Sequence, residues 1–256
     1  MKEGQKLWTR DELILAINLY CKLPFGRLHR HNPEIINLAS LIGRTPSSVA
    51  YKLVNFASLD PSLKTRGIKG ASNASKLDAE IWNEFYNNWD ELPYESEKLL
   101  AKIEHTSVEK LNNISDDELL KQGKTREQLV RTRVNQSFFR TSVLASYNNT
   151  CCITGIQQKE LLIAGHIKPW SLDEKNRLNP RNGITINALH DKAFESGLIT
   201  ITQDYKIKVS SILLKQTKSK AIEEYFIKYN NQDIILPSRF LPDVEFLKYH
   251  NEKFQP

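Results

Sequence analysis

The segment from Cys151 to Gly197 constrains the fold of this chain more than any other part of its sequence. The apolar runs CCITG and LLIAGH are short and are each followed by turn or loop residues, so they predict two strands. A polar loop follows, and NALHDKAFESG then predicts a short helix that ends at Gly197, a favourable residue just past a helix end. We therefore expect two strands, a loop and a helix, with His166 at the end of the second strand.

The N-terminal part of the chain predicts helices. Apolar residues recur at helical spacing over residues 8–23, 33–41 and 46–59, and the starts carry capping or proline signals, such as Thr9 with Glu12 and Thr45 with Pro46. Gly43 separates the second helix from the third, which is the helix-turn-helix pattern. A further helix is predicted over residues 77–92, with aromatic residues on its inner face.

The third predicted helix would bury Val49, Leu53 and Phe56 and turn its polar face outward. Arg44, Lys52 and Asn55 are then candidate DNA contacts, together with Ser48 and Tyr51. Residues 7–60 also resemble Myb/SANT-like DNA-binding modules. The alternative is a helical pair whose polar face only meets water.

Charge is distributed unevenly along the chain. Its net charge is +6, with −5 over residues 91–120 and +10 over residues 121–220. A strong positive field favours a polyanionic partner, although lysines that only maintain solubility are the alternative. The acidic stretch predicts a connector, so we expect a helical DNA-recognition domain (1–95), an acidic helical connector (96–125) and a second domain (126–256).

Composition excludes several classes of protein. No apolar run is long enough to span a membrane, and the first residues lack the apolar region of a secretory signal, so a soluble, cytoplasmic protein is expected. The three cysteines, Cys21, Cys151 and Cys152, cannot form a disulfide framework or the ligand set of a structural zinc.

A family resemblance rests on four motifs within residues 151–199. The motifs C-x-T-G, A-x-H-I-x-P-W, N-G and L-H-D-x-A-F-E-x-G-L resemble those of the HNH endonuclease family, and in particular its restriction-type branch. The similarity extends over about residues 130–254. It implies an α+β chain in which a ββα-metal nuclease domain, with flanking helices and a hairpin, follows the helical domain.

The resemblance assigns roles to two residues. His166 would be the general base that deprotonates water, and Asn182, sixteen residues later, would pin the intervening loop and orient that base. Apart from His166 and His190, four histidines have no such context and are expected to have surface or packing roles: His29, His31, His105 and His250.

The metal ligands are expected on the helix that follows. Asp191 and Glu195 stand at i and i+4, hence on one face, and their oxygens suit Mg²⁺, or alternatively Mn²⁺. His190 is the alternative ligand. Position 165, where many family members have a ligand, is glycine, and we expect water to fill that coordination position.

The resemblance predicts a metal-dependent endonuclease that acts on double-stranded DNA. Phosphate contacts are expected from Arg133, Arg140, Lys168 and Arg181, and cleavage of both strands predicts a homodimer or two successive nicks. The alternative is an inactive DNA-binding regulatory protein that keeps a nuclease-like fold, which the missing ligand at Gly165 favours. An RNA nuclease would use the same site, but no single-strand RNA module is evident.

Overall fold

The computed structural model describes residues 6–68, 71, 73–86, 88–115 and 125–254. The chain divides into two compact units, residues 1–141 (unit 1) and 142–256 (unit 2), with the boundary inside helix α9 (Arg126–Ser146). This division reflects contacts within the chain. The predicted boundaries 1–95, 96–125 and 126–256 concern function and stay a prediction. Residues 116–124 of the predicted connector lie outside the described residues.

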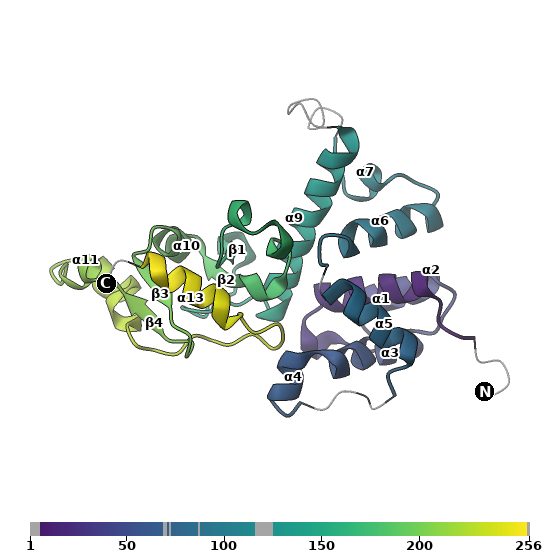
Figure 1. Cartoon of the computed structure of the whole chain (residues 1–256), viewed down its shortest axis with the longest axis horizontal. Coiled ribbons are helices and arrows are strands. Elements are labelled where there is room, and N and C mark those ends of the chain that lie inside the picture. The colour runs from purple at the N-terminus through teal and green to yellow at the C-terminus, as the bar shows by residue number, and fades with distance from the viewer. Residues whose placement is uncertain (1–5, 69–70, 72, 87, 116–124, 255–256) are drawn as a thin grey trace. The chain divides into compact units, whose positions relative to one another are not determined.

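Unit 1 is built from helices, shown in purple to teal in Figure 1. Besides the first part of α9, its described elements are α1 (Arg10–Lys22), η1 (Phe25–Arg27), α2 (Pro33–Leu41), α3 (Pro46–Leu59), α4 (Pro61–Thr65), α5 (Lys76–Tyr86), α6 (Leu92–Ile103) and α7 (Val108–Leu111).

The predicted starts of the first three helices are confirmed. Thr9 and Glu12 form a capping box on α1, and Thr45 caps α3 by accepting from the N–H of Ser48. Gly43 adopts φ +64° between α2 and α3, a conformation that favours glycine. Local chemistry therefore sets these helix boundaries.

Helix α1 contacts α2, α3, α5 and α6. Tyr20 of α1, Phe56 of α3 and Trp82 of α5 meet in an aromatic cluster, with ring centroids 5.9 to 6.4 Å apart. Because α6 contacts α1, the first part of the predicted connector belongs to the helical unit.

The prediction that Lys52 and Asn55 face outward is wrong. Both are buried, with 6% and 2% of their surface exposed, because α5 lies against α3. The ammonium of Lys52 is 2.8 Å from both carboxylate oxygens of Asp78 on α5. Asn55 donates to the carbonyl of Asn73, just before α5, at 3.5 Å.

Arg44 is also committed to the fold of unit 1, which contradicts its prediction as a DNA contact. Its guanidinium donates to Glu12 and to the carbonyls of Lys6 and Leu7, and it lies 4.1 Å from the ring centre of Trp8. The arginine side chain is only 7% exposed. It therefore ties the segment before α1 to the turn before α3.

Unit 2 combines two small sheets with helices, in the green to yellow part of Figure 1. Its described elements, after the end of α9, are η2 (Lys159–Leu161), β1 (Leu162–His166), η3 (Trp170–Leu172), η4 (Glu174–Asn176), η5 (Pro180–Asn182), β2 (Gly183–Asn187), α10 (Ala188–Glu195), β3 (Ile199–Ile201), β4 (Ile207–Val209), α11 (Ser211–Leu214), α12 (Lys220–Tyr225), η6 (Ile227–Tyr229) and α13 (Val244–Lys253).

Strands β1 and β2 are antiparallel, and so are β3 and β4. The strand predicted at CCITG is wrong: this segment is a turn, in which the N–H of Gly155 donates to the carbonyl of Cys151. The true partner of β1 is GITIN, whose five residues are all buried. A strand buried on both faces lacks the alternation of polar and apolar residues that marks a half-exposed strand.

Helix α10 contacts β1, β2 and β3, and α13 contacts β3. Isoleucines from the strands and Phe194 from α10 share one apolar core with Cys151 and Cys152. Within the residues described, no helix has the length and apolar character required to cross a membrane.

Candidate active site

The sheet β1–β2 and helix α10 form a ββα unit that positions the predicted site residues. In the register of the sheet, His166 at the end of β1 lies opposite Gly183 at the start of β2. Asn187 ends β2 and caps α10, since its side-chain oxygen accepts from the N–H of His190. The strand end and the helix are thus connected by a single residue.

His166 is held by the loop that connects the two strands. Its Nε2 lies 2.8 Å from the carbonyl oxygen of Arg177. Because a carbonyl oxygen only accepts, Nε2 carries the hydrogen, and in the neutral ring the lone pair is on Nδ1. Burial lowers the pKa of His166, against the raising effect of the bond to Arg177, so the neutral form is favoured near pH 7.

Two further contacts fix the surroundings of His166. The ring of Trp170 meets the imidazole edge to face, with 5.8 Å between centroids. The guanidinium of Arg177 lies 5.3 Å from the ring centre of the same tryptophan. Trp170 therefore contacts both the imidazole of His166 and the guanidinium of Arg177.

Asn182 fixes both ends of the same loop. This fully buried side chain accepts from the N–H of Lys168 at 2.8 Å and donates to the carbonyl of Lys168 at 3.0 Å. It also donates to the carbonyl of Asn176 at 3.3 Å. The amide pairs with Lys168 much as a strand residue would, so the geometry is that expected of a loop-pinning residue.

Asp191 approaches the backbone of β1 closely. A Cβ added to Gly165 would lie 2.7 Å from Oδ1 of Asp191, which is closer than real Cβ contacts allow. A carboxylate from α10 thus takes the space that a side chain at position 165 would occupy, and the water-filled coordination position expected there stays a prediction. Gly165 neighbours His166, so the carboxylate reaches the part of β1 that carries the predicted base.

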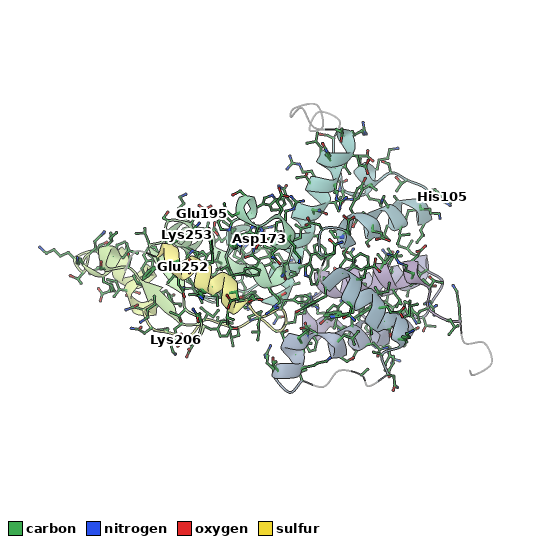
Figure 2. The ribbon with its side chains drawn as sticks, in the orientation of Figure 1. His105, Asp173, Glu195, Lys206, Glu252 and Lys253 are labelled. Atoms are coloured by element: carbon green, nitrogen blue, oxygen red, sulfur yellow. The ribbon has the colours of Figure 1, made fainter. Side chains whose placement is uncertain are left out.

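Glu195 is placed differently from Asp191, although both lie on α10. Its side chain is 65% exposed and pairs with Lys192 at 3.0 Å (Figure 2 labels Glu195). Asp191 is half-buried, and burial together with the negative charge of Glu195 raises its pKa. The structure thus brings Asp191 to the strand and leaves Glu195 in solvent.

His190 points into the core, away from the role of a metal ligand. Its Nδ1 is 3.0 Å from Oδ1 of Asn187, and its Nε2 is 2.6 Å from the carbonyl oxygen of Tyr225. The residue is 2% exposed and its ring contacts Phe226 and Tyr229. Both ring nitrogens of His190 therefore lie beside oxygens of the fold and are not open to a metal ion.

The carboxylates of α10 are the candidate ligands of a divalent ion. Within the described ranges, no group of three or more His, Cys, Asp or Glu side chains could hold a metal. Mg²⁺, however, binds through one or two carboxylates and completes its shell with water and substrate phosphate. Asp191, a half-buried carboxylate that no basic side chain pairs with among the described residues, fits that mode of binding.

The predicted phosphate-binding residues are distributed over two settings. Arg133 and Arg140 are exposed on α9. Lys168 pairs with Asp173 of its own loop at 2.9 Å, and Arg181 pairs with Asp243 at 3.0 Å. The last two cations therefore help to hold the loop and the segment before α13.

Sequence reasoning missed Tyr249 and Lys253 of α13, and Tyr249 contacts Lys168 of this loop. The ammonium groups of Lys168 and Lys253 are 5.3 and 4.7 Å from the ring centre of Tyr249 on α13 (Figure 2 labels Asp173 and Lys253). Tyr249 and Lys253 are spaced i, i+4, which is the signal that could have marked them as one face.

A comparison with protein families agrees with this geometry. Residues 151–202 match a family described as HNH endonuclease, and this range contains β1, the loop, β2 and α10. The chain therefore carries an HNH endonuclease domain in unit 2, which indicates a nuclease. A search of curated proteins found no match.

Proposed function

We propose that this chain is a metal-dependent DNA endonuclease of restriction type in which His166 is the general base. The observation that supports it most is the contact between Nε2 of His166 and the carbonyl of Arg177, which places the proton on Nε2 and the lone pair on Nδ1. A neutral, half-buried imidazole oriented in this way is suited to accept a proton from water near pH 7.

The remaining roles follow from the contacts of the loop and of α10. Asn182 keeps the loop, and hence the carbonyl of Arg177, in place, so that His166 stays oriented. Asp191, with Glu195 as a second carboxylate at the exposed end of the helix, would hold a divalent ion, Mg²⁺ or Mn²⁺. Such an ion polarises the scissile phosphate and stabilises the departing 3′ oxygen when it is bound.

The substrate proposed is double-stranded DNA, cut to leave 5′-phosphate ends. Arg133 and Arg140 are proposed to contact phosphates, because they are exposed arginines in the most basic part of the sequence. Two copies of the chain would be needed for one concerted cut of both strands. We propose a cytoplasmic location, since the sequence has the composition expected there.

The test is a plasmid-nicking assay with Mg²⁺ or Mn²⁺. His166→Ala is expected to lose about 10²-fold or more in rate, because the base is removed, while DNA binding survives. Added imidazole should restore part of the activity of this variant. His29→Ala, a change at an exposed histidine of unit 1, is the matched control and should cut normally.

A second candidate function is an inactive DNA-binding protein with a nuclease-like domain. The observation that favours it is the lack of a preformed cluster of three metal-binding side chains among the residues described. This alternative predicts that the protein binds DNA but does not nick it with either Mg²⁺ or Mn²⁺. Full nicking activity of the His166→Ala variant would contradict the role of His166 as the general base.

A further inference from the structure

Unit 1 contains a cavity of about 480 Å³ that lies among four helices. One stripe of α1 lines it with Leu15, Asn18, Leu19 and Lys22, which are spaced at three and four residues and so share a helix face. The other walls come from α2, α6 and the end of unit 1 on α9. The volume is in the range of small-molecule sites.

Two polar side chains that line this cavity are buried without partners. Asn18 is 4% exposed and Ser96 of α6 is fully buried. In the part of the chain that the structure describes, neither the amide oxygen of Asn18 nor the hydroxyl of Ser96 has a hydrogen-bond partner. A buried polar atom left in this way destabilises a fold, so its presence in a cavity points to a ligand that pairs with it.

The rest of the cavity defines the character of that ligand. Leu19, Leu41 and Leu100 line it and are only half-buried, so apolar surface is available there. The charged groups of its lining are Lys22, which pairs with Glu97 at 3.1 Å, and Glu34, which is exposed to solvent. The buried part of the lining therefore offers a ligand no unpaired charge, which favours an uncharged ligand.

We propose that this cavity binds an uncharged ring that carries an amide edge, meaning an N–H donor beside a carbonyl acceptor. The carboxamide of Asn18 would pair with that edge, the hydroxyl of Ser96 would supply a further hydrogen bond, and the leucines would cover the ring. Such an edge occurs on free small molecules and on nucleobases. The proposal does not depend on the nuclease activity of unit 2.

Calorimetry on the full chain tests the proposal with three rings of similar size: benzamide, ethylbenzene and benzoate. Benzamide is expected to bind about tenfold or more tightly than the other two, because ethylbenzene leaves Asn18 unpaired and benzoate is charged. If benzamide does not bind at millimolar concentration, the cavity holds only water and the proposal is overturned.

Substitutions then show whether the buried polar groups are responsible. Asn18→Leu should weaken benzamide binding about tenfold or more and favour ethylbenzene, and Ser96→Ala, which removes a single oxygen, carries the same test if Asn18→Leu does not fold. Asn37→Leu is the matched control, since Asn37 lines the cavity but is exposed. An equal loss of affinity at Asn37 would contradict the proposal.

Measurements of DNA binding distinguish the two possible sources of the amide edge, a nucleobase and a free small molecule. If a base turned out of DNA occupies the cavity, benzamide competes with DNA and Asn18→Leu weakens both to a similar extent. If a free small molecule occupies it, DNA affinity stays unchanged while benzamide binding is lost. The His166→Ala variant should bind benzamide normally, so failure of the nuclease proposal would not be mistaken for failure of this one.

Discussion

Gly165, the residue before the predicted base, allows the carboxylate of Asp191 to lie against β1. Here helix α10 supplies a carboxylate to the space that a side chain at position 165 would occupy. The closeness of the contact makes the glycine a positioning residue for Asp191.

Gly165→Ala is expected to displace Asp191 and to lower the rate of DNA cleavage by about 10²-fold. The added methyl would also approach Ile186 to 3.3 Å, so a stability loss of about 1–2 kcal/mol is expected. Nicking assays and urea unfolding measure the two effects. Gly26→Ala is the control, because no atom lies within 4 Å of the added methyl. A Gly165→Ala variant that cleaves DNA at the normal rate would show that Asp191 has no role in the mechanism.

His250 gives the native state a pH dependence. Its ring is 5% exposed and stacks on the ring of Phe194, with 3.5 Å between the centroids. Its Nε2 donates to the carbonyl of Phe194 at 3.0 Å, and Nδ1 of the neutral ring accepts from the hydroxyl of Thr200 at 2.7 Å. Burial lowers the pKa of His250 from 6.5 to about 4, against the raising effect of the bond to Phe194. The unfolded chain therefore binds this proton more tightly than the native chain does.

The contribution of neutral His250 to stability is fully present above pH 6.5 and is lost as the pH falls towards 4. The loss should reach about 3 kcal/mol in the free energy of unfolding. Urea titrations of the native protein and of the His250→Gln variant at several pH values isolate this contribution, because the variant lacks the titrating imidazole. An equal pH dependence in both proteins would contradict the prediction, and His29→Gln serves as the exposed control.

Local signals at single residues could be predicted from the sequence, whereas burial by distant segments could not. The caps at Thr9 and Thr45 depend on residues within three positions of themselves, and the sequence identified both. Lys52 and Asn55 were misplaced because α5 covers them, and its Asp78 lies 26 residues beyond Lys52. No periodicity within α3 reports that contact.

At the scale of elements, α10 ends against the C-terminus of α13. Gly197 follows α10 with φ +68°, and a Cβ there would lie 2.8 Å from the backbone carbonyl oxygen of Lys253. Backbone cannot give way as a flexible side chain can. The glycine thus permits both the helix end and the close approach of α13.

Gly197→Ala is expected to cost about 2–4 kcal/mol in the free energy of unfolding, because strain at positive φ adds to a backbone clash. Gly155→Ala is the matched control in the same unit: it has φ +75° but meets only Ile235, at 3.8 Å, and should cost about 1–2 kcal/mol. Chemical denaturation compares the two. Equal losses would show that the contact with Lys253 contributes nothing.

Elements of unit 2 were only partly predictable. The strand that ends at His166 and the helix that ends before Gly197 are confirmed, because turn and cap residues border them. The partner strand GITIN was missed in favour of CCITG, since both are short apolar runs and only pairing across the loop distinguishes them. Tertiary hydrogen bonds thus decide which run becomes a strand.

The whole molecule should bind DNA in a salt-dependent manner if the proposed function is right. Arg133 and Arg140 are exposed in the basic stretch of the sequence, and each phosphate contact releases counterions. Replacing both with alanine is expected to weaken binding to all sequences and to reduce the slope of log affinity against log salt by about 2. Lys102 is exposed and lies outside that stretch, so the control variant Lys102→Ala should leave the slope nearly unchanged. An unaltered slope in the double arginine variant would exclude these arginines from the interface.

Asn182 has a consequence for how such a nuclease can change over evolutionary time. One carboxamide holds both borders of the stretch between Lys168 and Asn182, so the geometry of the base depends little on the exposed residues at its tip, such as Leu172. Insertions or replacements at that tip should be tolerated, and they offer a route by which relatives could acquire new sequence preferences without rebuilding their chemistry.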